Sequence, residues 1–255
     1  MRAFAALIAA VSTISLMQTA SAADLPVKAP VYKAAPVVAP SSNWTGFYVG
    51  GHGGYAWNDS DAHYDGALFA STLASLGGTI SSSPRGGFGG VHAGYNYQYP
   101  SNFLVGIEGD ISWGRIRSTI PDIMGMLDGS TGDYVQSTST RFATVRGRVG
   151  YVANSLLLYG TGGVAFTNVK VLSVDYIGPG GPPSILNTSA NLTGWTAGAG
   201  LEYMIAPSWS LRAEYLHADF GKHTYFPGAV YQSTSDATSD SVRGGITYHF
   251  ANFVR

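Results

Sequence analysis

The alternation of apolar and polar residues along the chain is most regular over residues 141–167. From Ala143 to Tyr151 the odd positions hold Ala, Val, Gly, Val and Tyr, whereas the even positions hold Thr, Arg, Arg and Gly. A pleated strand imposes this period of two on its faces. A second apolar segment begins after Ala153-Asn154-Ser155, a break with room only for a tight turn. The pattern predicts a β-hairpin with one apolar face and one face that carries two arginines.

Six further segments alternate in the same way, which gives eight predicted strands. The six segments are residues 46–57, 86–98, 103–115, 194–203, 209–219 and 241–250. In each of them the larger apolar residues share one face, and small or polar residues occupy the other. The fifth strand, which is the second strand of the hairpin, is less clear. Leu156-Leu157-Leu158 is apolar on both faces, so the sequence does not show which of its residues face inward.

The connections between these strands alternate between long and short. Long polar stretches cover residues 58–85, 118–139, 175–190 and 222–238, and the breaks between them are tight. Short turns at one rim and long loops at the other are typical of small bacterial outer-membrane barrels. The predicted fold is therefore all-β: an eight-stranded antiparallel transmembrane up-and-down β-barrel with long extracellular loops and short periplasmic turns. The structural alternative is a soluble, lipocalin-like barrel.

Charged residues within the strands favour the membrane barrel. A soluble barrel would enclose its larger apolar residues around a ligand. In this chain the charged residues lie on one face of the strands and the larger apolar residues lie on the other, so enclosing the apolar residues would leave the charges on the outer wall. A carboxylate is costly in lipid and can be paired inside a narrow barrel. The predicted interior charge network consists of Glu108, Asp110, Arg146, Arg148, Glu202, Arg212, Glu214 and Arg243. The side chains predicted to face lipid include Val145, Val149, Leu201, Leu211, Ile246 and Tyr248.

Directly opposed residues of two antiparallel strands have numbers with a constant sum. Glu108 with Arg148 and Asp110 with Arg146 both give 256, so one register would satisfy both pairs. Side chains just fill the interior of an eight-stranded barrel. We therefore expect the charges to form a plug that closes the barrel to all but the smallest solutes.

Two more ion pairs are predicted on the other side of the barrel. Glu202 and Arg212 flank the turn at Pro207 symmetrically, and Glu214 and Arg243 lie on neighbouring strands. These pairs would complete an interior with four acids and four bases.

The N-terminus predicts export. One positive charge, an apolar run and a small-x-small site at Ala20-Ser21-Ala22 are typical of a cleaved signal peptide over residues 1–22. Residues 23–42 are rich in Pro and Ala and predict an extended periplasmic leader, either a plain linker or a contact with the cell wall. The outer-membrane barrel would then occupy residues 43–255.

Composition agrees with this class. The chain has no Cys, 34 Gly, 16 Tyr and only 11% charged residues, and a soluble surface needs more charge than that. Without Arg2, which the signal peptide removes, 13 Lys and Arg face 15 Asp and Glu, a formal net charge of −2. This near-neutral balance gives no indication of nucleic-acid binding.

The histidines do not indicate a metal site or a catalytic site. His52 and His92 are predicted to face one another inside the barrel if the first hairpin pairs symmetrically about its loop. Two imidazoles are too few for a metal site, so we expect them to fill space and to form hydrogen bonds, with no metal and no cofactor. His63, His217 and His223 are interpreted as loop or rim residues. No Ser-His-acid set falls at matching strand heights, and no enzymatic activity is predicted.

Five stretches carry a resemblance to a known family. They are residues 43–51, 145–151, 157–166, 194–203 and 209–215, which include Val-Arg-Gly-Arg-Val-Gly-Tyr and Gly-Trp-Thr-Ala-Gly-Ala-Gly-Leu-Glu-Tyr. They resemble the small outer-membrane immunogenic proteins of alphaproteobacteria, often described as porins and similar in plan to the transmembrane domain of OmpA. The resemblance covers the signal peptide and nearly all of the mature chain. It implies an envelope protein and surface antigen without catalytic residues.

The predicted function is a structural outer-membrane barrel and surface antigen that supports envelope integrity and surface or host contacts. Its expected partners are outer-membrane lipid, lipopolysaccharide and the barrel insertion machinery, with host or cell-wall contacts as further candidates. Two alternatives stay open: a diffusion porin for small solutes, and an adhesin that acts through the long loops. The sequence does not specify an oligomeric state or a host partner.

The C-terminus departs from the family pattern. Such barrels usually end at an aromatic residue that the insertion machinery reads, but here residues 251–255 follow Phe250. We predict that Tyr248 and Phe250 form the insertion signal. The alternative, a slip of the last strand toward Phe253, would move Arg243 toward the lipid face.

Overall fold

The computed structural model describes residues 43–64, 79–121, 133–176, 181–225 and 233–250. The predicted signal peptide, the predicted leader and residues 251–255 lie outside the described residues. Within them the regular structure is entirely β: β1 (Gly46–Tyr64), β2 (Thr79–Ser82), β3 (Arg85–Gln98), β4 (Phe103–Pro121), β5 (Tyr134–Ala153), β6 (Leu156–Tyr176), β7 (Pro183–Ala206), β8 (Trp209–Tyr225) and β9 (Ser233–His249). No helix in the described part of the chain is long and apolar enough to cross a membrane.

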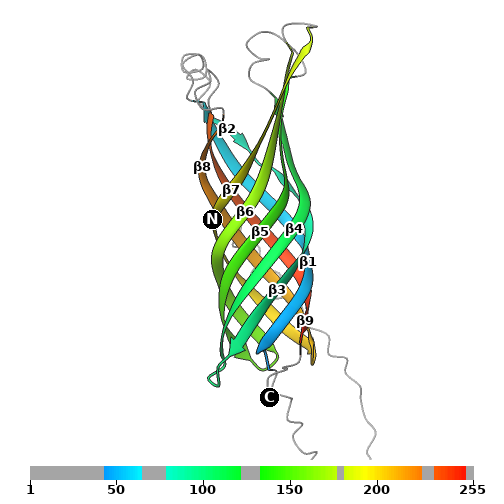
Figure 1. Cartoon of the computed structure of the whole chain (residues 1–255), viewed down its shortest axis with the longest axis vertical. Helices are drawn as coiled ribbons and strands as arrows, with labels where there is room; N and C mark the ends of the chain where they lie inside the picture. Colours follow the sequence, from blue (N-terminus) through cyan, green and yellow to red (C-terminus); the bar gives the residue numbers. More distant parts are fainter. Residues whose placement is uncertain (1–42, 65–78, 122–132, 177–180, 226–232, 251–255) are drawn as a thin grey trace, which may run out of the picture. The chain divides into compact units, whose positions relative to one another are not determined.

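The strands form a closed barrel (Figure 1). Consecutive strands pair antiparallel from β3 to β9, and β1 pairs with both β3 and β9. The short strand β2 pairs with the end of β1, beyond the point where Trp57 opposes Arg85. The ring therefore contains the eight predicted strands, and β2 lies within a stretch that was expected to be a long connection.

Most strands extend further than the alternation predicted. β5 already begins at Tyr134, β7 at Pro183 and β9 at Ser233, so much of the predicted loops 118–139, 175–190 and 222–238 is strand. These extensions are rich in Ser and Thr and have no apolar face. A period of two in hydropathy marks a strand only where one face meets an apolar environment, and the extensions are held instead by backbone pairing.

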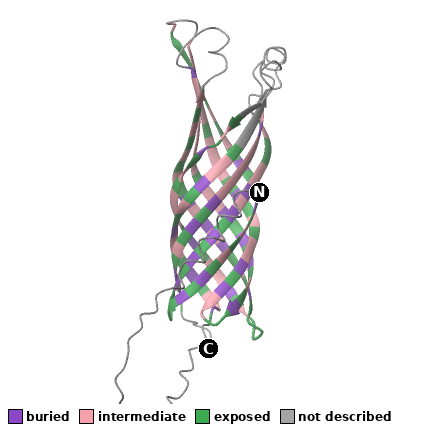
Figure 2. Ribbon diagram, turned by 180° about the vertical axis from the view of Figure 1, so that it is seen from behind, coloured by how far each residue is buried: buried purple, intermediate pink, exposed green. Residues whose placement is uncertain are grey.

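The two faces of the barrel confirm the predicted phase. Buried and exposed residues alternate along the strands in the lower part of the barrel (Figure 2). Val145 and Val149 are 53% and 63% exposed, whereas Arg146 between them is 1% exposed. On β6, the strand of uncertain phase, Leu157 points inward and is fully buried while Leu158 is half exposed on the outside.

Exposed aromatic residues lie in two bands on the outer face. The band near the short turns includes Phe47, Tyr97, Phe103, Tyr151, Tyr203, Trp209 and Phe250, and the band nearer the long connections includes Tyr55, Trp113, Phe166 and Trp195. On β4, ten residues separate Phe103 from Trp113. At about 3.4 Å per residue and a tilt of about 40°, the two bands are about 25 Å apart, which matches the apolar height of an outer-membrane barrel.

The end of β9 has the register that was predicted, in which the last strand does not slip toward Phe253. Its last residue is His249, and the Phe250 amide donates a hydrogen bond to the Phe47 carbonyl at 2.9 Å. Tyr248 packs on the outside, edge-on against Trp209 and Phe250 at ring distances of 5.0 and 5.2 Å. Arg243 stays buried in this register. The role of Tyr248 and Phe250 as an insertion signal stays a prediction.

Candidate functional site: a charged plug inside the barrel

Eight charged side chains meet in the barrel interior, and they are the eight that were predicted. Glu108 and Asp110 project from β4, Arg146 and Arg148 from β5, Glu202 from β7, Arg212 and Glu214 from β8, and Arg243 from β9. Strand alternation turns all of them inward, and each is at most 6% exposed. Four acids and four bases make the network neutral in formal charge.

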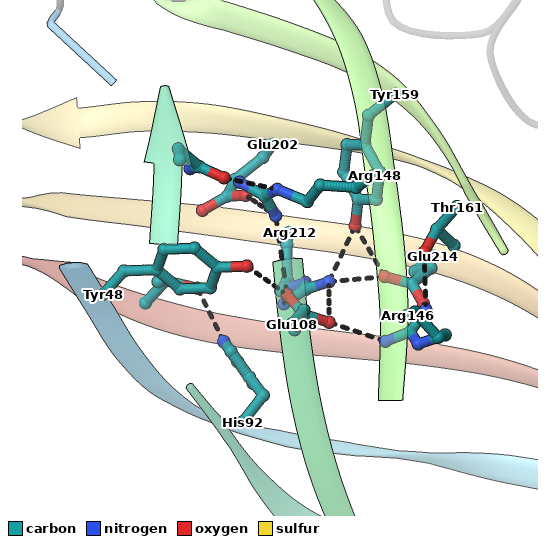
Figure 3. A network of polar contacts seen from close by, with 12 residues as sticks. Tyr48, His92, Glu108, Arg146, Arg148, Tyr159, Thr161, Glu202, Arg212 and Glu214 are labelled. Carbon is teal, nitrogen blue, oxygen red and sulfur yellow. Dashed lines mark hydrogen bonds and ion pairs between the residues drawn. The ribbon is translucent and has the colours of Figure 1, made fainter. Parts of the chain in front are cut away.

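Glu108 lies at the centre of the network (Figure 3). Its carboxylate accepts a hydrogen bond from Arg146 at 2.6 Å and one from Arg212 at 2.8 Å. Arg148 approaches the same carboxylate at 3.5 Å, and the Tyr48 hydroxyl donates to it at 2.9 Å. Four donors from three strands, β1, β5 and β8, therefore converge on a single carboxylate.

Glu214 is the second centre. Arg146 and Arg243 donate to one of its oxygens at 2.6 and 2.7 Å, while Arg212 and the Tyr159 hydroxyl donate to the other, the latter at 2.7 Å. Because Arg146 also bonds Glu108, this guanidinium bridges β4 and β8 across the lumen.

Asp110 and Glu202 lie at the edges of the network. Asp110 accepts from Arg243 and Arg146, each at 3.0 Å, and from the Thr144 hydroxyl. Glu202 pairs with Arg148 at 3.3 Å and accepts from Ser210 at 2.5 Å. Charge-assisted hydrogen bonds of this kind are the strongest that side chains form.

The predicted register between β4 and β5 is wrong by two residues. Glu108 opposes Arg146 and Gly106 opposes Arg148, so opposed numbers sum to 254 and not 256. A Cβ at position 106 would lie 3.2 Å from Arg148 Cγ, so the register places a glycine where the arginine needs space. A slip of two residues keeps every side chain on its face, and the predicted pairs Glu108–Arg148 and Asp110–Arg146 still form, diagonally.

Of the two ion pairs predicted on the other side of the barrel, one forms and the other does not. Glu214 opposes Arg243 and pairs with it at 2.7 Å, as predicted. Glu202 does oppose Arg212, but the guanidinium of Arg212 extends across the lumen to Glu108 and Glu214. Glu202 bonds Ser210 and Arg148 instead, because the long arginine side chain reaches acids on other strands.

His52 and His92 contact each other inside the barrel, but diagonally rather than directly opposed. His52 opposes Gly90, and the two Nδ1 atoms are 3.3 Å apart. The prediction of direct opposition therefore missed the register by two residues. Nε2 of His52 is 2.8 Å from the Ser112 hydroxyl, and Nε2 of His92 is 3.0 Å from that of Thr247. No group of three or more potential metal ligands occurs among the described residues.

An apolar cluster of buried residues lies at the end of the barrel with the short turns. It consists of Trp44, Leu104, Val152, Leu157, Tyr159 and Met204. The Trp44 amide donates to the Gln98 side chain at 3.0 Å, and its ring packs edge-on against His249 at 5.3 Å. Sequence reasoning missed Trp44, because this residue precedes the first strand and belongs to no alternating pattern.

Glycines give the interior aromatic residues their space. A Cβ at Gly200 would lie 2.5 Å from the Tyr159 hydroxyl, and one at Gly94 would overlap the hydroxyl of Tyr48. Both tyrosines donate to glutamates of the network. Without these two glycines the tyrosines could not lie across the neighbouring strand.

The sequence matches the family model of the outer membrane protein beta-barrel domain over residues 6–250. The chain belongs to this family. It is 34% identical over 237 residues to the 31 kDa outer-membrane immunogenic protein of Brucella melitensis, with 91% of this chain and 94% of that protein covered. It is 32% identical over 196 residues to the 22 kDa outer membrane protein of Rhizobium leguminosarum, with 74% and 70% covered. The predicted resemblance and the outer-membrane localisation are confirmed.

Solved outer-membrane barrels share the fold. The attachment invasion locus protein Ail of Yersinia pestis aligns with 81% of this chain and 100% of its own, at a TM-score of 0.42 and 17% identity. OprG of Pseudomonas aeruginosa aligns with 83% of this chain and 99% of its own, at a TM-score of 0.44 and 14% identity. Because the chain belongs to a family of outer-membrane barrels, and such barrels have short periplasmic turns and longer extracellular loops, the short-turn end is periplasmic and the other end extracellular.

One polar cluster of the outer-membrane barrel lies on its outer face and was not predicted. Asp240 on β9 accepts from the Tyr215 hydroxyl at 2.5 Å and lies 2.9 Å from His217 Nδ1. The His217 ring lies 5.4 Å from that of Trp195, in the extracellular aromatic band. His217 was interpreted as a rim residue, and its cross-strand pairing with Asp240 could be found only with the register known.

Proposed function

We propose that the protein is a structural barrel of the outer membrane that supports the envelope, presents its extracellular end at the surface and is closed to all but the smallest solutes. The observation that carries this proposal is the set of ion pairs across the lumen. Arg212 reaches from β8 to Glu108 on β4, and Arg146 reaches from β5 to Glu214 on β8. Arg243 on β9 pairs with Asp110 on β4.

Two features support closure. The interior of an eight-stranded barrel is only wide enough for its own side chains, and the network occupies it with residues that are nearly inaccessible to solvent. Toward the periplasm, the apolar cluster around Trp44 forms a second layer. A solute would have to separate buried ion pairs, and an unpaired buried charge costs about 3 to 5 kcal/mol.

Conductance in planar bilayers tests the proposal. Purified, refolded barrel should give only small and infrequent current steps, and heat-modifiable migration on gels would verify that the sample is folded. Stable channels on the nanosiemens scale from folded monomer would contradict closure and favour the diffusion porin.

A second candidate, an adhesin, has one specific observation in its favour. β5, β6 and β7 continue well beyond the extracellular aromatic band as a paired, Ser- and Thr-rich sheet, where Tyr134 opposes Val174 and Leu172 opposes Asn187. An ordered polar surface of this kind suits protein contact. Cells that display the protein should then bind host cells better than cells that display a barrel lacking the sheet extension, and equal binding would remove this candidate.

The proposal includes no enzymatic activity. Each buried carboxylate is paired with at least one buried arginine, so none is available as a general base. Hydrolysis of lipid A or of a protein substrate by the purified barrel would contradict this part of the proposal.

A further inference from the structure

A groove with a volume of about 520 Å³ runs over the outer wall of the barrel at its extracellular end. Its lining includes Arg115 and Arg117 from β4, Thr138 from β5, Lys170 from β6 and Ser189 from β7. Pairing aligns these strands, because Arg117 opposes Thr138, Thr138 opposes Lys170 and Lys170 opposes Ser189. The groove therefore crosses four neighbouring strands at one level.

The lining is on the outside of the barrel. Arg115 and Arg117 follow the lipid-facing Trp113 at intervals of two residues on β4, and both are exposed. Lys170 is exposed as well. Two strand spacings, about 10 Å, separate Arg117 from Lys170, so their long side chains can bind one ligand from two sides with the Thr138 hydroxyl between them.

The groove is basic and contains no acid. Its lining has three cations and no carboxylate, and two more cations adjoin it, since Arg85 opposes Arg117 and Arg141 opposes Trp113. Like charges directly opposed on neighbouring strands destabilise a sheet. A bound anion would offset this repulsion at the Arg85–Arg117 pair.

Charge is distributed unevenly around the barrel wall. Ten Lys and Arg residues lie in the described part of the chain: four belong to the plug, Lys222 lies on β8, and the other five, on β3 to β6, are Arg85, Arg115, Arg117, Arg141 and Lys170. The outer face of β1, β8 and β9 carries acids instead, namely Asp59, Asp219, Asp236 and Asp240. Lys222 is 4.0 Å from Asp236.

The height of the groove on the barrel wall indicates a ligand in the lipid headgroup layer. Arg115 and Arg117 follow Trp113 by two and four residues, which places them about 5 and 10 Å above the aromatic band at the usual rise and tilt. The polar headgroup layer begins at this height. An anion held in a lipid headgroup can reach these side chains from the side, along the barrel wall.

We propose that this groove binds the phosphate groups of a phosphorylated glycolipid in the outer leaflet. Arg115, Arg117 and Lys170 contact the phosphates, Thr138 and Ser189 contact sugar hydroxyls, and the acyl chains run down the wall past Trp113. The proposal goes beyond the closed-barrel function and does not depend on whether the barrel conducts. It concerns the lipid interface of a single copy of this chain.

Lipid binding to the purified barrel in zwitterionic detergent tests the site, with native mass spectrometry as the readout. The probes are bisphosphorylated lipid A and the same lipid without its phosphates. The variant Arg117→Gln/Lys170→Gln should bind lipid A at least tenfold more weakly than wild type, and Arg117→Lys/Lys170→Arg should retain binding. The matched control is Lys222→Gln, which removes an exposed cation from the opposite wall and should change nothing.

The outcomes separate the possible sources of binding. All variants should keep the heat-modifiable migration of the folded barrel, because the substituted side chains are exposed. Equal binding of lipid A by wild type and Arg117→Gln/Lys170→Gln would overturn the proposal, as would equal affinity for the dephosphorylated lipid. Displacement of lipid A by equimolar inorganic phosphate would indicate a free-anion site instead. Binding of a soluble sulfated glycan but not of lipid A would overturn it as well.

Discussion

Replacement of Arg146 by alanine should destabilise the barrel more than any other single change in the plug. The Arg146 guanidinium donates to three carboxylates: at 2.6 Å to Glu108, at 2.6 Å to Glu214 and at 3.0 Å to Asp110. Its removal changes the formal charge of the network from zero to −1 in a site that water barely reaches. Loss of one partner from a buried ion pair costs about 3 to 5 kcal/mol, and we expect the upper end of this range.

Arg148→Ala is the internal comparison. Arg148 contacts its carboxylates at 3.3 and 3.5 Å, longer than the contacts of Arg146, and lies over the Tyr48 ring at 4.6 Å. We expect it to cost about 3 kcal/mol, the lower end of the range for a broken buried pair. Arg141→Ala removes an exposed arginine from the same strand and should stay within about 0.5 kcal/mol of wild type.

The assay is equilibrium unfolding in urea of barrel refolded into lipid vesicles, followed by tryptophan fluorescence and by heat-modifiable migration. A second substitution tests the physical reason. Asp110→Asn in the Arg146→Ala background restores a neutral network, so the double variant should be more stable than Arg146→Ala alone. A cost for Arg146→Ala below that for Arg148→Ala, or a further loss in the double variant, would refute the electrostatic account.

Two other substitutions test the lipid face and the interior glycines. Val145→Arg places a charge on the lipid-facing wall and should lower the free energy of unfolding by about 2 to 4 kcal/mol. Thr193→Arg places the same charge near the extracellular aromatic band, where the penalty should be only about 0 to 1 kcal/mol. Equal penalties would mean that the outward face is assigned wrongly. Gly94→Ala should cost about 1 to 3 kcal/mol by overpacking against Tyr48. Gly109→Ala, with only ordinary contacts, is its control in the same urea titration, and equal stability of both would contradict the close packing of Tyr48.

The strands within the lipid band, their two faces and the members of the charge network could be predicted from the sequence. Alternation is a local property: Arg146 lies between Val145 and Gly147, and the pleat alone sends it to the face opposite Val145. The membrane then decides which face is inside, since a carboxylate such as Glu108 is far less costly in a lumen than in lipid.

The ends of the strands could not be predicted in this way. Above the aromatic bands both faces of β5 to β7 meet a polar environment, so hydropathy has no period there, and only backbone pairing shows that β7 begins at Pro183. Trp44 was missed for a related reason, because it packs into the lumen from outside any strand.

Which charges pair was decided only by the tertiary structure. Registers that differ by two residues place the same side chains on the same faces, so alternation cannot distinguish a sum of 254 from one of 256 for β4 and β5. The choice depends on packing, as at Gly106 beside Arg148. An arginine is also long enough to cross a narrow lumen, so Arg212 reaches Glu108 and Glu214 while its cross-strand neighbour Glu202 pairs with Arg148. The sequence by itself determined that these charges face the interior, and the closed ring determined their partners, because only closure brings β4 and β8 within reach of each other.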